Sequence, residues 1–193
     1  MPDLRPHSGL IVEVPESEFA VAQHREALDI NARGGVPAHF TVLYPFLQPE
    51  QIDETVLAHL GTLFADVPAF DIALTHTSWF DSHVLWLAPE DPAPFRALTE
   101  RVHAAYPDYP PFAGLYADVV PHLTVGHGEQ LAEMALAEID VKQHLPIRST
   151  ARAVTLMTQD EPDGAWTTAA RFPLATRGDN AGAAGERGAT VAP

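Results

Sequence analysis

One short pattern occurs twice in this chain, and it constrains the fold more than any other feature. Residues 39–42 and residues 122–125 both read His-apolar-Thr-Val. Alternate side chains of a β-strand point to the same face, so His39 and Thr41 would share one face of a strand. His122 and Thr124 would do the same in a second strand, with the intervening apolar residues buried behind. Two such strands facing each other would form a cleft with two imidazoles and two hydroxyls.

The patterns around the two motifs predict a similar order of elements in both halves of the chain. The same order of five elements is predicted at about residues 8–80 and again at about 83–158: strand, helix, His-x-Thr strand, helix and strand. The predicted strands outside the motifs are 8–14, 70–79, 84–88, 151–157 and 166–174, and the predicted helices are 17–29, 49–64, 91–105 and 129–139. A strong turn signal, Glu-Pro-Asp-Gly at 161–164, joins the last two strands.

Antiparallel strands interleaved with helices in two similar halves predict an α+β fold. Two sheets would face across a cleft, with one His-x-Thr strand in each. The alternative, a doubly wound α/β fold, lacks the Gly-rich phosphate loop expected after its first strand. We expect residues 1–175 to form a single two-lobed domain, because 193 residues suit one domain or one built from two similar halves. Residues 176–193 are rich in Gly and Ala, and we expect a disordered tail there.

The composition limits the classes of partner. The net charge is −15, with 26 acidic against 11 basic residues, which argues against extensive nucleic-acid binding. A small charged substrate in a local pocket is still compatible with that charge. The chain contains no cysteine, which excludes disulfides and thiolate metal sites. We find neither an apolar run that approaches the roughly 18 residues of a membrane helix nor a secretory signal, and we expect a cytoplasmic monomer with no membrane partner.

The paired motifs, 83 residues apart, resemble those of the two-histidine phosphoesterase superfamily. That superfamily includes the bacterial 2′-5′ RNA ligase-like proteins and the 2′,3′-cyclic nucleotide phosphodiesterases. The resemblance covers residues 8–175. It implies a bilobal α+β fold in which two sheets with outer helices are related by a pseudo-two-fold axis, and the motifs line a central cleft. It also implies catalysis without metal or cofactor.

The resemblance assigns a role to each residue of the motifs. His39 and His122 would be the acid–base pair, with His122 as the base and His39 as the acid. Thr41 and Thr124 would hold phosphate oxygens. Many ligase-like members place an Arg five residues after the second histidine, where this chain has His127. An Arg makes a permanent bidentate phosphate contact, whereas a His is charged only when protonated, so the difference bears on the recognition of RNA ends.

Physical chemistry supports the same reaction. Opening a cyclic phosphodiester with water needs a base to take a proton from water and an acid to protonate the leaving oxygen. Two imidazoles titrate near neutrality and can fill both roles. Threonine hydroxyls can donate hydrogen bonds to the non-bridging oxygens. We therefore predict a metal-independent phosphoesterase acting on a small nucleotide or RNA-end phosphate: a 2′,3′-cyclic phosphate or a related cyclic or 2′-5′ phosphodiester.

Three alternatives stay open at this point. The chain could be a non-catalytic nucleotide or RNA-end binding module, or an RNA 2′-5′ ligase. It could also be a metal-dependent hydrolase in which His39, His122 and His127 bind zinc, although no carboxylate or cysteine stands at ligand spacing near them. Beside the histidines and threonines of the motifs, we expect His127 and Tyr44 to contact the substrate, Tyr44 as part of the cleft wall. We interpret His76 and His83 as surface residues and Trp86 as core.

Overall fold

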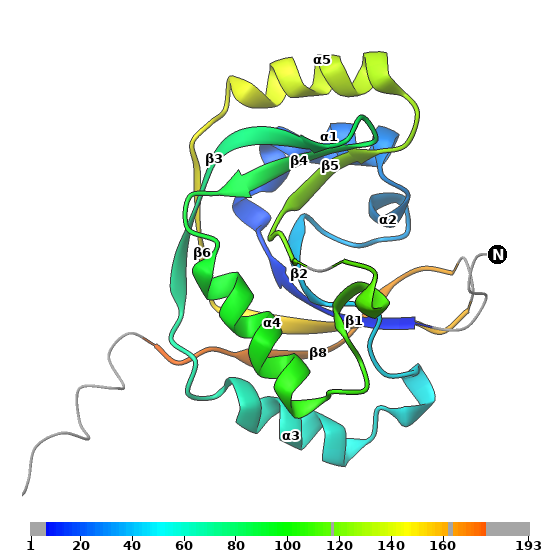
Figure 1. Cartoon of the computed structure of the whole chain (residues 1–193), viewed down its shortest axis with the longest axis vertical. Coiled ribbons are helices and arrows are strands. Elements are labelled where there is room, and N and C mark those ends of the chain that lie inside the picture. Colours follow the sequence, from blue (N-terminus) through cyan, green and yellow to red (C-terminus); the bar gives the residue numbers. More distant parts are fainter. Residues whose placement is uncertain (1–6, 117, 162–163, 177–193) are drawn as a thin grey trace, which may run out of the picture.

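The computed structural model describes residues 7–116, 118–161 and 164–176, which form two four-stranded antiparallel sheets (Figure 1). The first sheet has the strand order β2-β1-β7-β8 and the second has the order β5-β4-β3-β6. The strands of the first sheet are β1 (His7–Glu13), β2 (His39–Leu43), β7 (Ala153–Gln159) and β8 (Thr167–Pro173). Those of the second are β3 (Phe70–Phe80), β4 (Val84–Pro89), β5 (Leu123–His127) and β6 (Ile147–Ala151). The predicted α+β fold with two antiparallel sheets is confirmed.

Among the described residues, five α-helices connect and cover these strands: α1 (Glu18–Leu28), α2 (Ile30–Arg33), α3 (Glu54–Phe64), α4 (Ala93–Ala105) and α5 (Leu131–Lys142). Figure 1 shows α5 and α1 on one side of the second sheet and α3 beside β8 at the opposite end of the molecule. No helix in the described part of the chain is both long and apolar enough to cross a membrane.

The two sheets are built in the same way around the His-x-Thr strands. Strands β2 and β5 each lie at a sheet edge and pair with β1 and β4, the strands that open the two halves. Thr41 lies opposite Ile11, and Thr124 lies opposite Trp86. In both pairs the register shifts at the residue opposite the threonine. The two motifs therefore occupy equivalent positions in their sheets.

Each motif strand is backed by a helix from the other half of the chain. Helix α1 links β1 to β2 but packs against β5, and α4 links β4 to β5 but packs against β2. On β2, Phe40 stacks on Phe95 of α4 at 4.0 Å between ring centroids. On β5, a Cβ atom at Gly126 would lie 3.1 Å from Leu28 of α1 and 3.0 Å from Met134 of α5. Glycine is therefore needed where these two helices approach the strand.

The predicted alternation of burial along the motif strands is confirmed. Phe40 and Val42 are buried, as are Leu123 and Val125, and all belong to one apolar core that extends over both sheets. The histidines and threonines of the motifs are only half-buried, on the opposite face. The strands therefore anchor their apolar face in the core and present their polar face to a shared space.

The observed elements differ from the predicted ones at three points. The helix predicted over 49–64 is a 3₁₀ turn at Pro49–Gln51 followed by α3, because the Asp53 side chain accepts a hydrogen bond from the Val56 amide at 2.9 Å and caps the helix there. Strand β6 was not predicted. The second motif strand begins at Leu123, so that His122 directly precedes it.

The two repeated segments also exchange strands instead of forming separate halves. Strand β3, at the end of the first segment, pairs with β4 and β6 in the second sheet. Strand β7 pairs with β1 in the first sheet. At the predicted turn, the Gly164 amide donates to the Glu161 carbonyl at 2.9 Å, whereas residues 162 and 163 lie outside the described residues. The predicted disordered tail, apart from Thr176, also lies outside them.

Candidate active site

A cavity of about 680 Å³ brings together every site residue that the sequence analysis named. His39, Thr41 and Tyr44 line it from β2 and the residue that follows, and the second motif lines it with His122, Thr124 and His127. Because the two motifs lie in different sheets, the cavity is a junction between the sheets. It is large enough for a mononucleotide, since ligand pockets typically measure about 300–1,000 Å³.

Both motif histidines are held by the same backbone contact. The Nδ1 atom of His39 lies 2.7 Å from the carbonyl oxygen of Pro37, and that of His122 lies 2.7 Å from the carbonyl oxygen of Val120. A carbonyl oxygen can only accept a hydrogen bond, so Nδ1 carries the proton in both rings. In the neutral ring Nε2 is then the nitrogen with a free lone pair. Each imidazole is thus fixed in the tautomer that leaves Nε2 for proton transfer.

Burial shifts the titration of both rings toward lower pH. The pKa of His39 falls from 6.5 to about 4, mainly because the ring is buried; the nearby charges of Arg25 and His122 act in the same direction, whereas the Pro37 carbonyl and Asp29 partly oppose the shift. Burial also lowers the pKa of His122, with the Val120 carbonyl acting in the opposite direction. Both rings are therefore neutral at pH 7. Of the two, His39 is shifted further.

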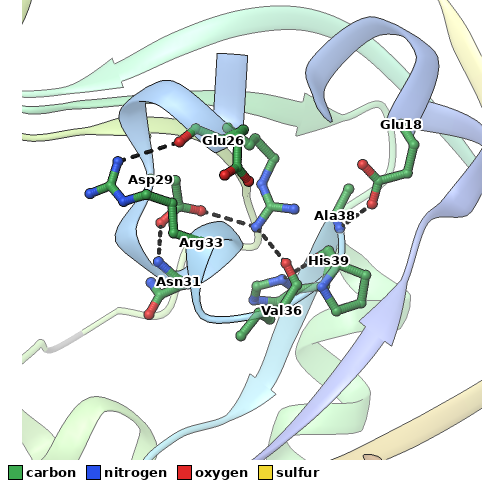
Figure 2. Close-up of polar contacts among 10 residues, drawn as sticks. Glu18, Glu26, Asp29, Asn31, Arg33, Val36, Ala38 and His39 are labelled. Carbon is green, nitrogen blue, oxygen red and sulfur yellow. Dashed lines mark hydrogen bonds and ion pairs between the residues drawn. The ribbon is translucent and has the colours of Figure 1, made fainter. Parts of the chain in front are cut away.

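Helix α1 holds the segment that precedes His39 through a buried ion pair (Figure 2). Arg25 Nη2 donates to Asp29 Oδ2 at 3.0 Å and to the Val36 carbonyl at 3.2 Å. Asp29 Oδ1 accepts from the Asn31 amide at 3.0 Å, which fixes the start of α2. Arg25 and Asp29 are 2% and 1% exposed, so the pair is shielded from water.

A second contact from α1 holds the residue just before His39. Glu18 Oε1 accepts a hydrogen bond from the Ala38 amide at 2.7 Å, also visible in Figure 2. The Pro37 carbonyl therefore lies between two tethered residues, Val36 and Ala38. Sequence reasoning missed Arg25 and Asp29. Their spacing of four residues in a helix was the available signal, but such pairs usually lie on exposed faces.

Aromatic rings surround the second histidine and line one wall of the cavity. The edge of Phe80 meets His122 at 4.9 Å between centroids, and Phe80 stacks on Trp86 at 4.7 Å. Trp86 is buried, as predicted, yet its ring also lies 5.9 Å from that of His122. Across the cavity, Tyr44 meets Trp166 edge to face at 6.1 Å. Apolar and aromatic surface is thus available for a base or sugar on both sides of the histidines.

The remaining histidines of interest differ in position. His76 is exposed and lies outside the cavity, in agreement with the prediction. His83 is also exposed, but it lines the cavity together with His127. The His83 carbonyl accepts a hydrogen bond from the Gly128 amide at 2.9 Å, which holds His83 next to the end of β5. Within the described ranges, no group of three His, Cys, Asp or Glu side chains is placed to hold a metal ion.

Comparison with known proteins gives the same picture at the level of family and fold. The model of the 2′-5′ RNA ligase superfamily matches residues 13–163. The structure of TT0787 from Thermus thermophilus is similar, with a TM-score of 0.59 and 19% identity over 87% of this chain and 97% of that one. The structure of Escherichia coli LigT complexed with 3′-AMP has a TM-score of 0.57 and 18% identity over 88% of this chain and 99% of that one. At these identities the two structures show a shared fold. No match was found among curated proteins.

Proposed function

The chain belongs to the 2′-5′ RNA ligase superfamily, whose matched region contains both His-x-Thr motifs, and we propose that it hydrolyses a 2′,3′-cyclic phosphate or a related cyclic or 2′-5′ phosphodiester without a metal ion. The observation that carries the proposal is the pair of imidazoles in one cavity, each held as the Nδ1–H tautomer by a carbonyl at 2.7 Å. Two rings with a free Nε2 can act as base and acid at once.

The reaction needs one proton on the pair. A neutral imidazole takes a proton from water while the water oxygen forms a bond to phosphorus. The bond from phosphorus to one sugar oxygen then breaks, and the protonated imidazole gives its proton to that oxygen. The products are a phosphomonoester and a free hydroxyl group, and the pair again holds one proton in total.

The electrostatics favour His39 as the base and His122 as the acid. Because the pKa of His39 is lowered further, a single proton shared by the two rings resides on His122. We therefore assign His39 to the attacking water and His122 to the leaving oxygen. This order is the reverse of the one that family likeness suggests.

Other residues that line the cavity complete the proposed substrate site. The hydroxyls of Thr41 and Thr124 would donate hydrogen bonds to the non-bridging oxygens as negative charge builds on them. Tyr44 and Trp166 would contact the base or sugar, and His127 a phosphate oxygen. A crystal structure of E. coli LigT contains 3′-AMP, a nucleoside monophosphate of the kind that opening a 2′,3′-cyclic phosphate yields. This ligand supports a mononucleotide as the unit recognised here.

The test is hydrolysis of the four nucleoside 2′,3′-cyclic phosphates in EDTA, with chromatography to separate the 2′- and 3′-phosphate products. The wild type should form a single isomer. His39→Ala and His122→Ala should each lower kcat by about 10²–10⁴-fold, the usual contribution of an acid or base. His76→Ala is the matched control, because this histidine is exposed and lies outside the cavity.

Two outcomes would contradict the proposal. Loss of activity in EDTA would indicate a metal-dependent hydrolase. The folded protein could also bind the nucleotides but hydrolyse neither any of them nor a 2′-5′ linked dinucleotide. That result would indicate a binding module.

A further inference from the structure

The charged groups that line the cavity are unusual for a phosphate site. Sites for phosphate commonly use Arg or Lys, because their charge is fixed. Of the described residues that line this cavity, none is Arg or Lys. The residues that can carry charge are three aspartates and four histidines, namely Asp29, Asp81, Asp118, His39, His83, His122 and His127.

The balance of these groups at neutral pH is negative. Asp29 is neutralised by Arg25 at 3.0 Å, behind the cavity wall. Asp81 and Asp118 are exposed, and no salt bridge links either of them to a described residue. Burial lowers the pKa of both motif histidines, so the pair contributes no more than the one proton that the reaction requires, fewer than the charges of the two exposed carboxylates. His83 and His127 also line the cavity, and neither supplies the fixed charge of an Arg or a Lys. Two carboxylates thus remain, in a chain whose net charge is −15.

We propose that this cavity selects its substrate by charge: it takes a singly charged cyclic phosphodiester that carries no other phosphate, and it repels the doubly charged product. This inference rests on the proposed function and narrows its substrate class to a nucleoside 2′,3′-cyclic phosphate or a compound of equal charge. An RNA end, or a nucleotide with a second phosphate, brings additional negative charge to Asp81 and Asp118.

The reaction itself supplies the change in charge. A cyclic phosphodiester carries one negative charge, whereas a phosphomonoester carries about 1.5–2 at pH 7. The hydroxyls of Thr41 and Thr124 suffice to hold the first, because they donate hydrogen bonds without adding charge. Ring opening then raises the negative charge in a cavity that two exposed carboxylates also line. Product release is favoured by the same repulsion that excludes phosphorylated competitors.

The experiment compares adenosine 2′,3′-cyclic phosphate with the same compound bearing a 5′-phosphate. The wild type should show a kcat/KM about tenfold or more higher for the compound without the 5′-phosphate, and that preference should shrink at high salt because screening weakens exposed charges. The adenosine monophosphate product should inhibit only at concentrations well above KM.

Variants separate charge from shape. The double variant Asp81→Asn/Asp118→Asn should reduce the preference several-fold, and His127→Arg should reduce it independently by adding a fixed cation. The matched control is Glu100→Gln, which removes one charge from the exposed face of α4 outside the cavity and should leave the preference unchanged.

Each result decides between the two proposals. Equal kcat/KM for the two compounds would overturn the inference and leave the proposed function intact. A preference that neither salt nor the aspartate variants alter would be steric and would overturn the inference as well. If neither compound nor any other nucleoside cyclic phosphate is hydrolysed, the proposed function fails, and the inference fails with it.

Discussion

His39 and His122 come from different sheets, yet each donates its Nδ1 proton to the carbonyl oxygen two residues earlier, at 2.7 Å in both cases. The two rings are therefore in the same tautomeric state without help from a carboxylate. What differs is the surroundings: a buried Arg25–Asp29 pair lies behind His39, whereas Phe80 and Trp86 flank His122. This difference in environment is what supports the opposite roles that we propose for the two histidines.

The pH dependence of kcat/KM should be bell-shaped with its optimum on the acid side of neutrality. The midpoint of the acid limb should lie near pH 4, where His39 becomes protonated and can no longer act as a base. The midpoint of the alkaline limb should lie below pH 6.5, because burial lowers the pKa of His122 and the ring therefore loses its proton at a lower pH than a free histidine. Both limbs report the pair rather than either ring alone. A rate that is constant between about pH 5 and 8 would contradict the roles assigned to the pair.

Acidification should also destabilise the fold through His39. The pKa of His39 is lower in the folded state than the ordinary 6.5, so between pH 6.5 and about 4 the unfolded state binds more protons and the free energy of unfolding falls as the pH falls. The ring is half-buried, and we expect its share of the loss to be roughly 1–3 kcal/mol. Urea unfolding at pH 7 and pH 4.5 should show a smaller loss in His39→Gln than in the wild type. An equal loss in both proteins would exclude this contribution.

Removing either threonine hydroxyl should affect the rate more than the stability. Thr41→Val and Thr124→Val keep the shape of the side chain in a strand, and each removes one hydrogen-bond donor from the proposed phosphate site. We expect kcat to fall by about 10²–10³-fold per variant, the range for one such donor. Steady-state kinetics would measure it, with Thr62→Val on the exposed face of α3 as the control. Unchanged kcat in both variants would remove these hydroxyls from the mechanism.

Breaking the buried ion pair behind His39 should destabilise the protein strongly. Arg25→Met leaves the Asp29 carboxylate buried without its cation, at an expected loss of about 3–5 kcal/mol in the free energy of unfolding. The double variant Arg25→Met/Asp29→Asn should recover part of that loss. Lys142→Met is a matched control, because Lys142 pairs with Glu138 at the same spacing of four residues but is itself exposed, and Glu138 keeps its hydrogen bonds from Thr77 and Trp79; this variant should lose no more than about 0.5 kcal/mol. Equal losses in the two single variants would mean that burial of the pair has little effect.

Much of the fold could be predicted because the motif strands alternate so clearly. Phe40, Val42 and Val125 mark a buried face, and the opposite face then has to hold the histidines and threonines. The exchange of strands between the two segments could not be predicted, because pairing of β1 with β7 depends on contacts between residues about 145 positions apart. Strand β6 was missed because Arg148, Ser149 and Thr150 interrupt any apolar pattern.

The six residues named in advance could be placed in one cavity for a similar reason: the two equivalent strands carry His39, Thr41, Thr124 and His127, and the other two, Tyr44 and His122, each adjoin one end of these strands. The backbone carbonyls of Pro37 and Val120 could not be foreseen, because every residue has a carbonyl and only the fold decides which one meets an imidazole. Asp81 and Asp118 lie outside the strands, and their approach to the cavity is set by loop geometry alone.

The pairing of β1 with β7 has a consequence for synthesis of the protein. Strand β1 is made first and finds β2 within about 30 residues, but its other neighbour ends at Gln159. At 5–20 residues per second, the ribosome needs on the order of 10–30 s to reach that point. Throughout this interval one side of an apolar strand presents unpaired N–H and C=O groups, which is the kind of edge to which other chains add. We therefore expect the nascent chain to expose a sheet edge along β1 that pairing with β7 removes in the folded protein.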